Sequence, residues 1–212
     1  MIITGDVHGK FDKYFNLVKD HEYSICLGDF GFQDSWKNLE YSNLSHYKHK
    51  ILGGNHDDYN YVKNSLFSLG DYGEFELENK EFFFIRGGLS LDKTYREFER
   101  IKGNVKTYWV EEELNLDEML GCMKEYIEVK PSIVFSHSAP SEITKMICLD
   151  PGFLVKYGFD ENFSDNTSRL LQNLFEIHQP LLWVFGHLHK SFNQVVNGTE
   201  FICLKELETL KL

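Results

Sequence analysis

Short apolar runs alternate with amphipathic stretches in the first third of the chain. We expect strands in the runs MIIT, YSICL and HKILG, at residues 1–4, 23–27 and 49–53. Apolar positions recur at helical spacing over 10–20, and helices are also expected at 36–47 and 58–66. This alternation is typical of βαβ units, in which the strands run parallel.

The pattern changes after this region. It predicts a hairpin over 73–88, with Asn79-Lys80 near its turn, and a second hairpin over 192–204 with Asn197-Gly198 at its turn. Residues 90–111 and 139–166 have no clear period and are expected to be irregular or rich in loops. The remaining apolar patterns predict helices at 116–129 and 167–179 and strands at 132–135 and 181–185. Together these elements indicate one α/β domain over residues 1–212, whose sheets mix parallel and antiparallel strands.

Composition and charge indicate which kinds of binding partner the protein is expected to have. Hydrophobic residues make up 42% of the 212 residues, which is enough for a sizeable core. The net charge of -11 argues against broad binding to nucleic acids or anionic membranes, although a bound metal can dominate its own surroundings.

Compartment is predicted from the apolar runs and the cysteines. The run at 181–185 is far too short to span a bilayer, and we expect no secretory signal before the first strand. The four cysteines form no C-x-x-C pair, so reduced thiols and a cytoplasmic location are expected.

Histidines and acids follow several of the predicted strands. The segments are IITGDVH, ICLGD, ILGGNHD, IVFSH and WVFGHLH. Loops at the carboxyl ends of strands build the sites of α/β sheets, so these side chains are expected to converge. The other histidines, His21, His46, His49 and His178, lie in polar or helical surroundings and are expected to have surface or packing roles.

Two of these segments carry potential ligands two residues apart. Asp6 and His8 form one pair and His187 and His189 form the other, and residues two apart project to the same side of an extended segment. An Asp that caps an ordinary turn explains GDVHG by itself. It does not explain five strand ends that all carry ligand-type side chains, because buried carboxylates and imidazoles without partners cost several kcal/mol each. A metal would supply those partners.

Between residues 5 and 189 the chain contains, in this order, the motifs GDVHG, LGDFG, GGNHDD, FSHSAP and FGHLH. This ordered set resembles that of the calcineurin-like metallophosphoesterase superfamily. The resemblance implies a four-layer α/β/β/α sandwich of two mixed β-sheets flanked by helices. It also implies a site for two divalent metal ions, with Asp6, His8 and His189 on one ion, Asn55, His137 and His187 on the other, and Asp29 bridging both. Imidazole and oxygen ligands favour Mn, Fe, Zn, Ni or Co over Ca, and we expect Mn²⁺.

The chemistry implied by the resemblance is hydrolysis of a phosphate mono- or diester by a hydroxide held between the two ions. His56 would protonate the leaving oxygen, and Asp57 would orient the His56 ring and stabilise its charged form. The alternative for His56 is a local hydrogen bond within its loop.

Substrate specificity is less constrained. The stretch GDFGFQDSW lacks the Arg of the G-D-x-x-D-R-G motif in the superfamily's Ser/Thr protein phosphatases, which argues against that activity. The segment IRGGLSLDKTYREFER resembles a stretch in some bacterial and phage members. Arg86 and Arg96 are therefore candidates to bind a substrate phosphate, with Asp92 holding one of them, and the alternative is that both are solvated surface charges. Trp109 is expected to anchor the start of a helix.

We expect a small phosphorylated substrate. Four aromatic residues flank the motifs and give a weak indication of a nucleotide: Phe30, Phe32, Trp36 and Tyr59. The competing function is that of an inactive scaffold with the same fold. The histidines of G-N-H and G-H-x-H are present, which favours the enzyme. The sequence carries no signal of oligomeric state.

Overall fold

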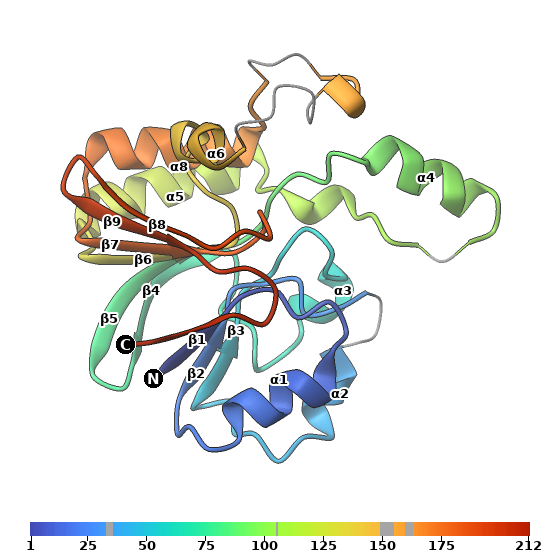
Figure 1. Cartoon of the computed structure of the whole chain (residues 1–212), viewed down its shortest axis with the longest axis horizontal. Coiled ribbons are helices and arrows are strands. Elements are labelled where there is room, and N and C mark those ends of the chain that lie inside the picture. Colours follow the sequence, from blue (N-terminus) through green and yellow to red (C-terminus); the bar gives the residue numbers. More distant parts are fainter. Residues whose placement is uncertain (33–35, 105, 149–154, 160–162) are drawn as a thin grey trace.

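Two β-sheets form the centre of the fold (Figure 1). The computed structural model describes residues 1–32, 36–104, 106–148, 155–159 and 163–212. In the first sheet the order is β10-β1-β2-β3, with β1 (Ile2–Thr4), β2 (Ser24–Cys26) and β3 (His49–Ile51) parallel. β10 (Thr209–Lys211) runs antiparallel to β1, so the last described strand closes the edge of the sheet beside the first.

The second sheet has six strands in the order β4-β5-β6-β7-β9-β8. Its bounds are β4 (Tyr72–Leu77), β5 (Lys80–Ile85), β6 (Ile133–Ser136), β7 (Leu182–Phe185), β8 (Phe192–Val196) and β9 (Thr199–Cys203). β5, β6, β7 and β9 are parallel, and the two outer pairs are antiparallel hairpins. Both predicted hairpins are confirmed. Each turns through two residues of positive φ, Glu78-Asn79 and Asn197-Gly198, the conformation that tight hairpin turns favour.

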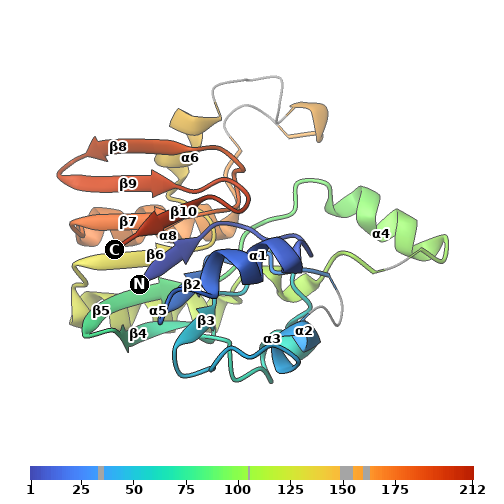
Figure 2. The same cartoon turned by 60° about the horizontal axis from the view of Figure 1, so that its bottom comes forward.

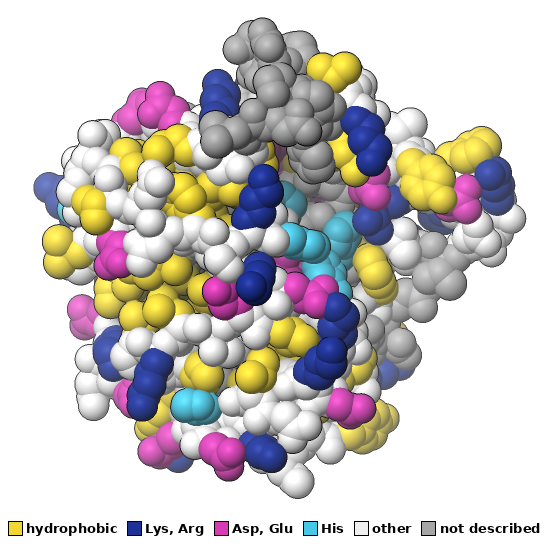
Figure 3. Space-filling view, in the orientation of Figure 1, with side chains coloured by type: hydrophobic (Ala, Val, Ile, Leu, Met, Phe, Trp, Pro, Cys, Tyr) yellow, Lys and Arg dark blue, Asp and Glu magenta, His cyan; other side chains and the backbone are white. Residues whose placement is uncertain are grey.

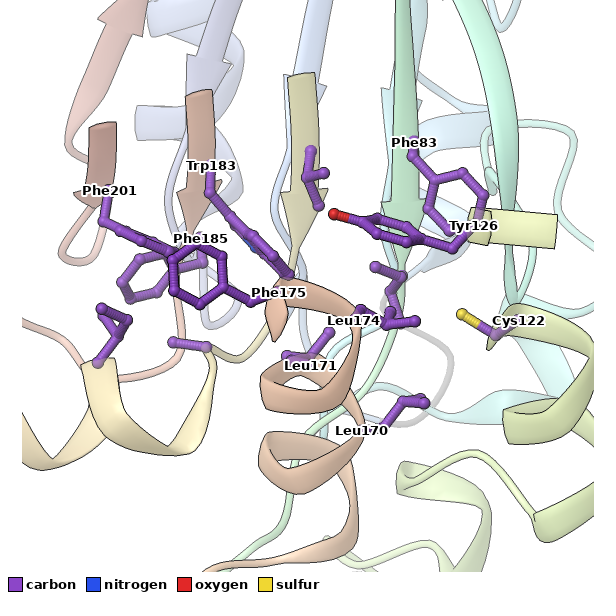
Figure 4. Close-up of a cluster of buried hydrophobic side chains, with 14 of the residues drawn as sticks. Phe83, Cys122, Tyr126, Leu170, Leu171, Leu174, Phe175, Trp183, Phe185 and Phe201 are labelled. Carbon is purple, nitrogen blue, oxygen red and sulfur yellow. The ribbon is translucent and has the colours of Figure 1, made fainter. Parts of the chain in front are cut away.

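Three apolar clusters hold four layers together (Figure 2). The inner cluster joins the facing sides of the sheets, with residues such as Ile25 and Phe135. The outer side of the first sheet packs against α1 (Phe11–Val18), α2 (Lys37–Glu40) and α3 (Tyr59–Val62). The outer side of the second sheet packs against α5 (Leu116–Val129), α6 (Ser141–Ile147) and α8 (Asn166–Ile177), where large aromatic side chains interlock (Figure 4). The predicted α/β/β/α sandwich is confirmed.

Local side chains explain where the helices begin and end. Asn115 and Glu118 form a reciprocal capping box at the start of α5, and Lys130 ends that helix in a left-handed conformation directly before Pro131. This helix matches the predicted range. The helix expected over 36–47 is shorter than predicted. The Ser42 hydroxyl donates to the carbonyl of Leu39 and accepts from the amide of Leu44, and these bonds replace the helical ones.

One segment expected to be irregular contains a helix. α4 (Lys93–Ile101) has no buried residue and projects from the rest of the molecule (Figure 1). Ion pairs three or four residues apart support it, including Asp92–Arg96 and Glu97–Arg100. The expected irregular stretch 139–166 likewise contains α6, while residues 149–154 and 160–162 of that stretch lie outside the described part.

Trp109 and the cysteines lie as the sequence suggests. Trp109 is buried directly before the 3-10 helix Val110–Glu112, so it anchors a helix start as predicted. All four cysteines are free, and only Cys148 among them is not fully buried. Within the described ranges, none of the helices combines the length and apolar character needed to cross a membrane.

Candidate metal centre

The carboxyl ends of strands from both sheets meet at one edge of the sandwich. Asp6 and His8 follow β1, Asp29 follows β2, Asn55 follows β3, His137 follows β6, and His187 and His189 follow β7. Figure 3 shows histidine side chains gathered beside a hollow at the centre of this face. The predicted ligand positions are therefore brought together, and they separate into two groups around Asp29.

The first group consists of Asp6, His8, Asp29 and His189. One ligand atom from each lies within 4.8 Å of the others. Asp6 Oδ2 lies 3.0 Å from His189 Nε2, and the Nε2 atoms of His8 and His189 are 3.0 Å apart. His8 Nε2 is 3.7 Å from Oδ2 of both Asp6 and Asp29. Two imidazole nitrogens and two carboxylate oxygens thus point at one small volume.

The two carboxylates of this group each have one engaged and one free oxygen. Asp6 Oδ1 accepts from the His187 amide at 3.1 Å, and Asp29 Oδ1 accepts from the His56 amide at 2.9 Å. Both Oδ2 atoms are buried, form no well-aligned hydrogen bond among the described residues, and face imidazole nitrogens, His189 Nε2 at 3.0 Å from Asp6 and His8 Nε2 at 3.7 Å from Asp29. Burial opposes ionisation, but the close imidazoles of His189 and His8 hold the pKa of Asp6 below its ordinary range, and the imidazoles around Asp29, first of them His137, do the same for Asp29. The free oxygens therefore carry negative charge that a cation would compensate.

The second group consists of Asn55, His137 and His187. His137 Nδ1 lies 2.8 Å from the carbonyl of Leu27, and because a carbonyl only accepts, Nδ1 donates its proton there. His137 Nε2 lies 2.9 Å from Asn55 Oδ1, so two acceptor atoms face each other unless a proton or a metal ion lies between them. The ring centres of His137 and His187 are 5.0 Å apart.

Asp29 lies between the two groups. Its Oδ1 is 3.4 Å from His137 Nε2 in the second group, and its Oδ2 is 3.7 Å from His8 Nε2 in the first. Gly54 approaches Asp29 so closely that an added Cβ would collide with Asp29 Oδ1 and the Asp29 amide. Position 54 must therefore be a glycine, because any side chain there would occupy the space of the Asp29 carboxylate.

The backbone at the site is not extended as the spacing argument assumed. His8, Asp29, His187 and His189 all have positive φ, which is uncommon for residues with a Cβ and costs of order 1–3 kcal/mol each. His187 and His189 therefore do not act as one pair of ligands: His189 joins the first group and His187 the second, which is the division that the resemblance implied. Strained positions of this kind concentrate at functional sites, where the surrounding structure holds them in place.

His56 lies at the edge of the first group. Its Nε2 is 4.0 Å from Asp29 Oδ2, and its ring centre is 5.6 Å from that of His8 and 5.3 Å from that of Phe32. Burial lowers the pKa of His56 to about 4, so the ring is neutral at pH 7.

Asp57 has other partners than the predicted one. Its oxygens accept from the Gly31 amide at 3.1 Å, the Trp36 indole at 2.9 Å and the Gly54 amide at 2.8 Å. None of these bonds comes from the His56 ring. Asp57 therefore fixes the loop that carries His56 to the loop after β2, instead of orienting the ring directly.

A pocket of about 470 Å³ opens beside the two groups. Asp29, Asn55, His56, His187 and His189 line one part of it, and the described remainder includes Leu89, Leu91, Arg96, Tyr157 and Lys190. Arg96 Nε donates to Asp92 at 2.6 Å, which is the contact expected for Asp92, and its guanidinium lies 5.8 Å from the Phe32 ring centre.

Arg86 and three of the four aromatic candidates lie elsewhere. Arg86 is buried, paired with Asp71 and Glu118 and stacked 4.4 Å above the Tyr59 ring. It is not among the described residues that line the pocket, so it holds the end of β5 in place. Phe30, Trp36 and Tyr59 are buried in the core, which leaves Phe32 as the aromatic candidate beside the site.

A model of the calcineurin-like phosphoesterase family matches residues 1–191. The chain belongs to the calcineurin-like phosphoesterase family. Its fold is similar to that of TT1561 from Thermus thermophilus, with a TM-score of 0.54 and 12% identity over 98% of this chain and 90% of that one. No curated protein shows significant sequence similarity to it.

Two further solved structures show weaker similarity, also at 12% identity. The phosphopantetheinyl hydrolase PptH from Mycobacterium tuberculosis has a TM-score of 0.43, with 96% of this chain and 89% of that one covered. GAP50, the anchor in the inner membrane complex of Plasmodium, has a TM-score of 0.46, with 97% and 71% covered.

As a member of this metal-dependent family, the protein has donors that suit divalent transition metals. Carboxylate oxygens, imidazole nitrogens and one amide oxygen converge, and the partnerless Oδ2 atoms of Asp6 and Asp29 mark where positive charge fits. Ser90, which accepts a hydrogen bond from Asn55 Nδ2 at 2.9 Å, was not predicted from the sequence. A serine in a polar loop carries no signal by which a single sequence could identify it.

Proposed function

We propose that this calcineurin-like phosphoesterase is a metal-dependent phosphoric ester hydrolase acting on a small, nucleotide-like phosphate mono- or diester. The observation that supports it most directly is the pair of buried carboxylates, Asp6 and Asp29, whose partnerless oxygens face imidazole nitrogens beside an open pocket. A scaffold has no need to keep such an arrangement, because buried charge without a partner destabilises the fold.

The donor groups divide naturally between two ions. Asp6, His8 and His189 would hold the first, and Asn55, His137 and His187 the second, with Asp29 offering one oxygen to each. Two bound divalent ions would lower the pKa of water to about 7 and offset the charge on the phosphoryl oxygens. The Leu27 carbonyl fixes the tautomer of His137, which keeps the Nε2 lone pair facing Asn55 Oδ1. Mn²⁺ is our first choice of metal.

His56 is the proposed proton donor to the leaving oxygen. It lines the pocket at the edge of the first group. Burial, opposed by the charge of Asp29, favours the neutral ring and lowers the pKa of His56 to about 4. A phosphate bound beside the ring brings negative charge, which raises the pKa of His56 in the direction that an acid requires. Asp57 contributes by fixing the loop of His56 through the Gly31, Trp36 and Gly54 hydrogen bonds.

The pocket supports a small substrate. About 470 Å³ lies in the range of small-molecule sites, and the net charge of -11 disfavours long polyanions. Arg96 is pre-positioned by Asp92 and by the Thr107 carbonyl, and is proposed to bind an oxygen of the substrate phosphate.

Hydrolysis should depend on added divalent metal. We expect the purified protein with Mn²⁺ to hydrolyse p-nitrophenyl phosphate or its bis ester, and chelation with EDTA to abolish turnover. Comparing mono-, di- and cyclic phosphate substrates then assigns the ester class. Absence of turnover across Mn, Fe, Zn, Ni and Co would favour the inactive scaffold.

Arg96→Ala should weaken substrate binding more than it slows chemistry. We expect KM to rise about 10- to 100-fold, because one charge-assisted hydrogen bond to phosphate contributes on the order of 1.5–3 kcal/mol. The matched control is Arg100→Ala, since Arg100 lies on the same helix but pairs with Glu97. Steady-state kinetics on both variants check this, and equal effects of the two substitutions would contradict a substrate role for Arg96.

A further inference from the structure

Ser90 and Glu112 lie beside the second group, and the proposed function gives neither a role. Ser90 belongs to the loop after β5, and Glu112 ends the 3-10 helix Val110–Glu112 in the segment between α4 and α5 (Figure 1). Both residues are 2% exposed. A serine and a glutamate are unusual choices for such burial unless their polar atoms are used.

A chain of hydrogen bonds connects them to Asn55. Asn55 Nδ2 donates to Ser90 Oγ at 2.9 Å, and the Ser90 amide donates to Glu112 Oε1 at 3.0 Å. Glu112 therefore fixes the backbone of Ser90, and Ser90 in turn fixes the amide of Asn55.

The orientation of this amide decides whether Asn55 can bind a cation. With Nδ2 bonded to Ser90, Oδ1 faces His137 Nε2 at 2.9 Å. A rotation of the amide by half a turn would exchange the two ends and direct the NH₂ group at His137. An NH₂ group has no lone pair to offer and repels a cation, so the rotated amide would remove a ligand from the second group.

The backbone of Glu112 acts on the same group through Gly88. The Gly88 amide donates to the Glu112 carbonyl at 3.2 Å. Gly88 packs against both rings, since an added Cβ would lie 3.3 Å from His187 Cε1 and 3.4 Å from His137 Cδ2. Glu112 also has a cost: its Oε2 is buried without a partner among the described residues, and burial raises its pKa to about 8. Glu112 therefore destabilises the fold through its buried carboxylate, yet it holds the loop after β5 at both Gly88 and Ser90. This combination fits a positioning role.

We propose that Ser90 and Glu112 are positioning residues that orient the Asn55 amide and so set the affinity of the second metal group. The inference rests on the proposed function, because it assigns Asn55, His137 and His187 to one ion. The inference predicts weaker metal binding by the second group and unchanged binding by the first. A general loss of stability would instead affect both groups.

Ser90→Ala is the first test, read by titrating Mn²⁺ into metal-free protein by calorimetry. We expect two classes of site in the unsubstituted protein, with the second class identified as the one that His137→Ala abolishes. Ser90→Ala should weaken the second class about 10- to 100-fold, as loss of an outer partner of a ligand typically does, and leave the first class within about twofold. Thermal unfolding of the metal-free protein measures any general loss of stability.

Glu112 offers a second pair of variants and a matched control. Glu112→Gln retains an oxygen that accepts from the Ser90 amide and should bind metal nearly as the unsubstituted protein does, whereas Glu112→Leu should resemble Ser90→Ala. Glu113→Gln is the control, because the neighbouring carboxylate instead accepts from Thr167 at the start of α8. It should leave both classes unchanged.

Three outcomes would overturn the inference. Unchanged binding of both classes in Ser90→Ala and Glu112→Leu would refute it and leave the proposed function intact. Equal weakening of both classes, with a lowered melting temperature of the metal-free variants, would show a purely structural role. Absence of divalent-metal binding in the unsubstituted protein would remove the proposed function and the inference together.

Discussion

Asp29→Asn is expected to abolish metal-dependent hydrolysis, with kcat/KM falling at least about 1,000-fold. The substitution keeps the shape of the side chain, and an amide oxygen can still accept from the His56 amide as Asp29 Oδ1 does. It replaces the partnerless Oδ2 with an NH₂ group that repels a cation. Asp29 offers Oδ2 to the first group and Oδ1 to the second. The first proposed ion therefore loses this ligand, and the second keeps only a neutral amide oxygen in place of a carboxylate. Both proposed ions are affected at once, and this is why the expected loss exceeds that from any other single ligand.

Thermal unfolding with and without Mn²⁺ measures the same loss independently of activity. An ion present at 100 times its dissociation constant stabilises by about 2.7 kcal/mol, which raises the melting temperature of a domain of this size by roughly 5–10 °C. Asp29→Asn should lose this shift. Asp58→Asn is the control, because Asp58 caps α3 just beyond the same motif and Asn caps helices equally well. A Mn²⁺ shift that survives in Asp29→Asn would refute the proposed bridging position.

The fold could be predicted from sequence wherever an element is specified by the core it packs against or by local capping. The apolar runs gave β1 and β2, and the box formed by Asn115 and Glu118 marks the start of α5. The sequence did not predict α4, because this helix buries no residue against the core; ion pairs along its surface support it instead. The order of strands in the second sheet, where β9 lies between β7 and β8, depends on long-range pairing that no local pattern encodes.

The candidate site was predictable in its residue types and less so in its geometry. Carboxylates and imidazoles after successive strands are conspicuous, and the structure gathers them. The spacing of His187 and His189 by itself placed both side chains on one side of the chain, and only the resemblance assigned their rings to different groups; both residues have positive φ. Two of the three partners of Asp57, Gly31 and Trp36, lie more than twenty residues earlier in the chain, so the sequence alone suggested the adjacent His56 instead.

With an alkyl phosphate as substrate, His56→Gln is expected to lower kcat by about 100- to 10,000-fold while both metal groups remain intact. Removing a general acid typically costs this much, and Gln keeps a polar side chain that cannot protonate the leaving oxygen at pH 7. His56 contributes its backbone amide to Asp29 Oδ1, and that contact survives substitution of the side chain. The Mn²⁺-dependent melting shift should therefore match that of the unsubstituted protein.

The identity of the leaving group provides the sharpest readout for His56. A p-nitrophenolate departs as a stabilised anion and needs little protonation, so the loss in His56→Gln should be small for p-nitrophenyl phosphate and large for an alkyl phosphate. His46→Gln is the control, because His46 packs against Tyr47 and Phe67 and is not among the described residues that line the pocket. An equal loss for both leaving groups would assign His56 to binding or loop structure, and loss of the Mn²⁺ shift would assign it to the metal centre. Only a loss that grows with the basicity of the leaving oxygen supports the proton-donor role.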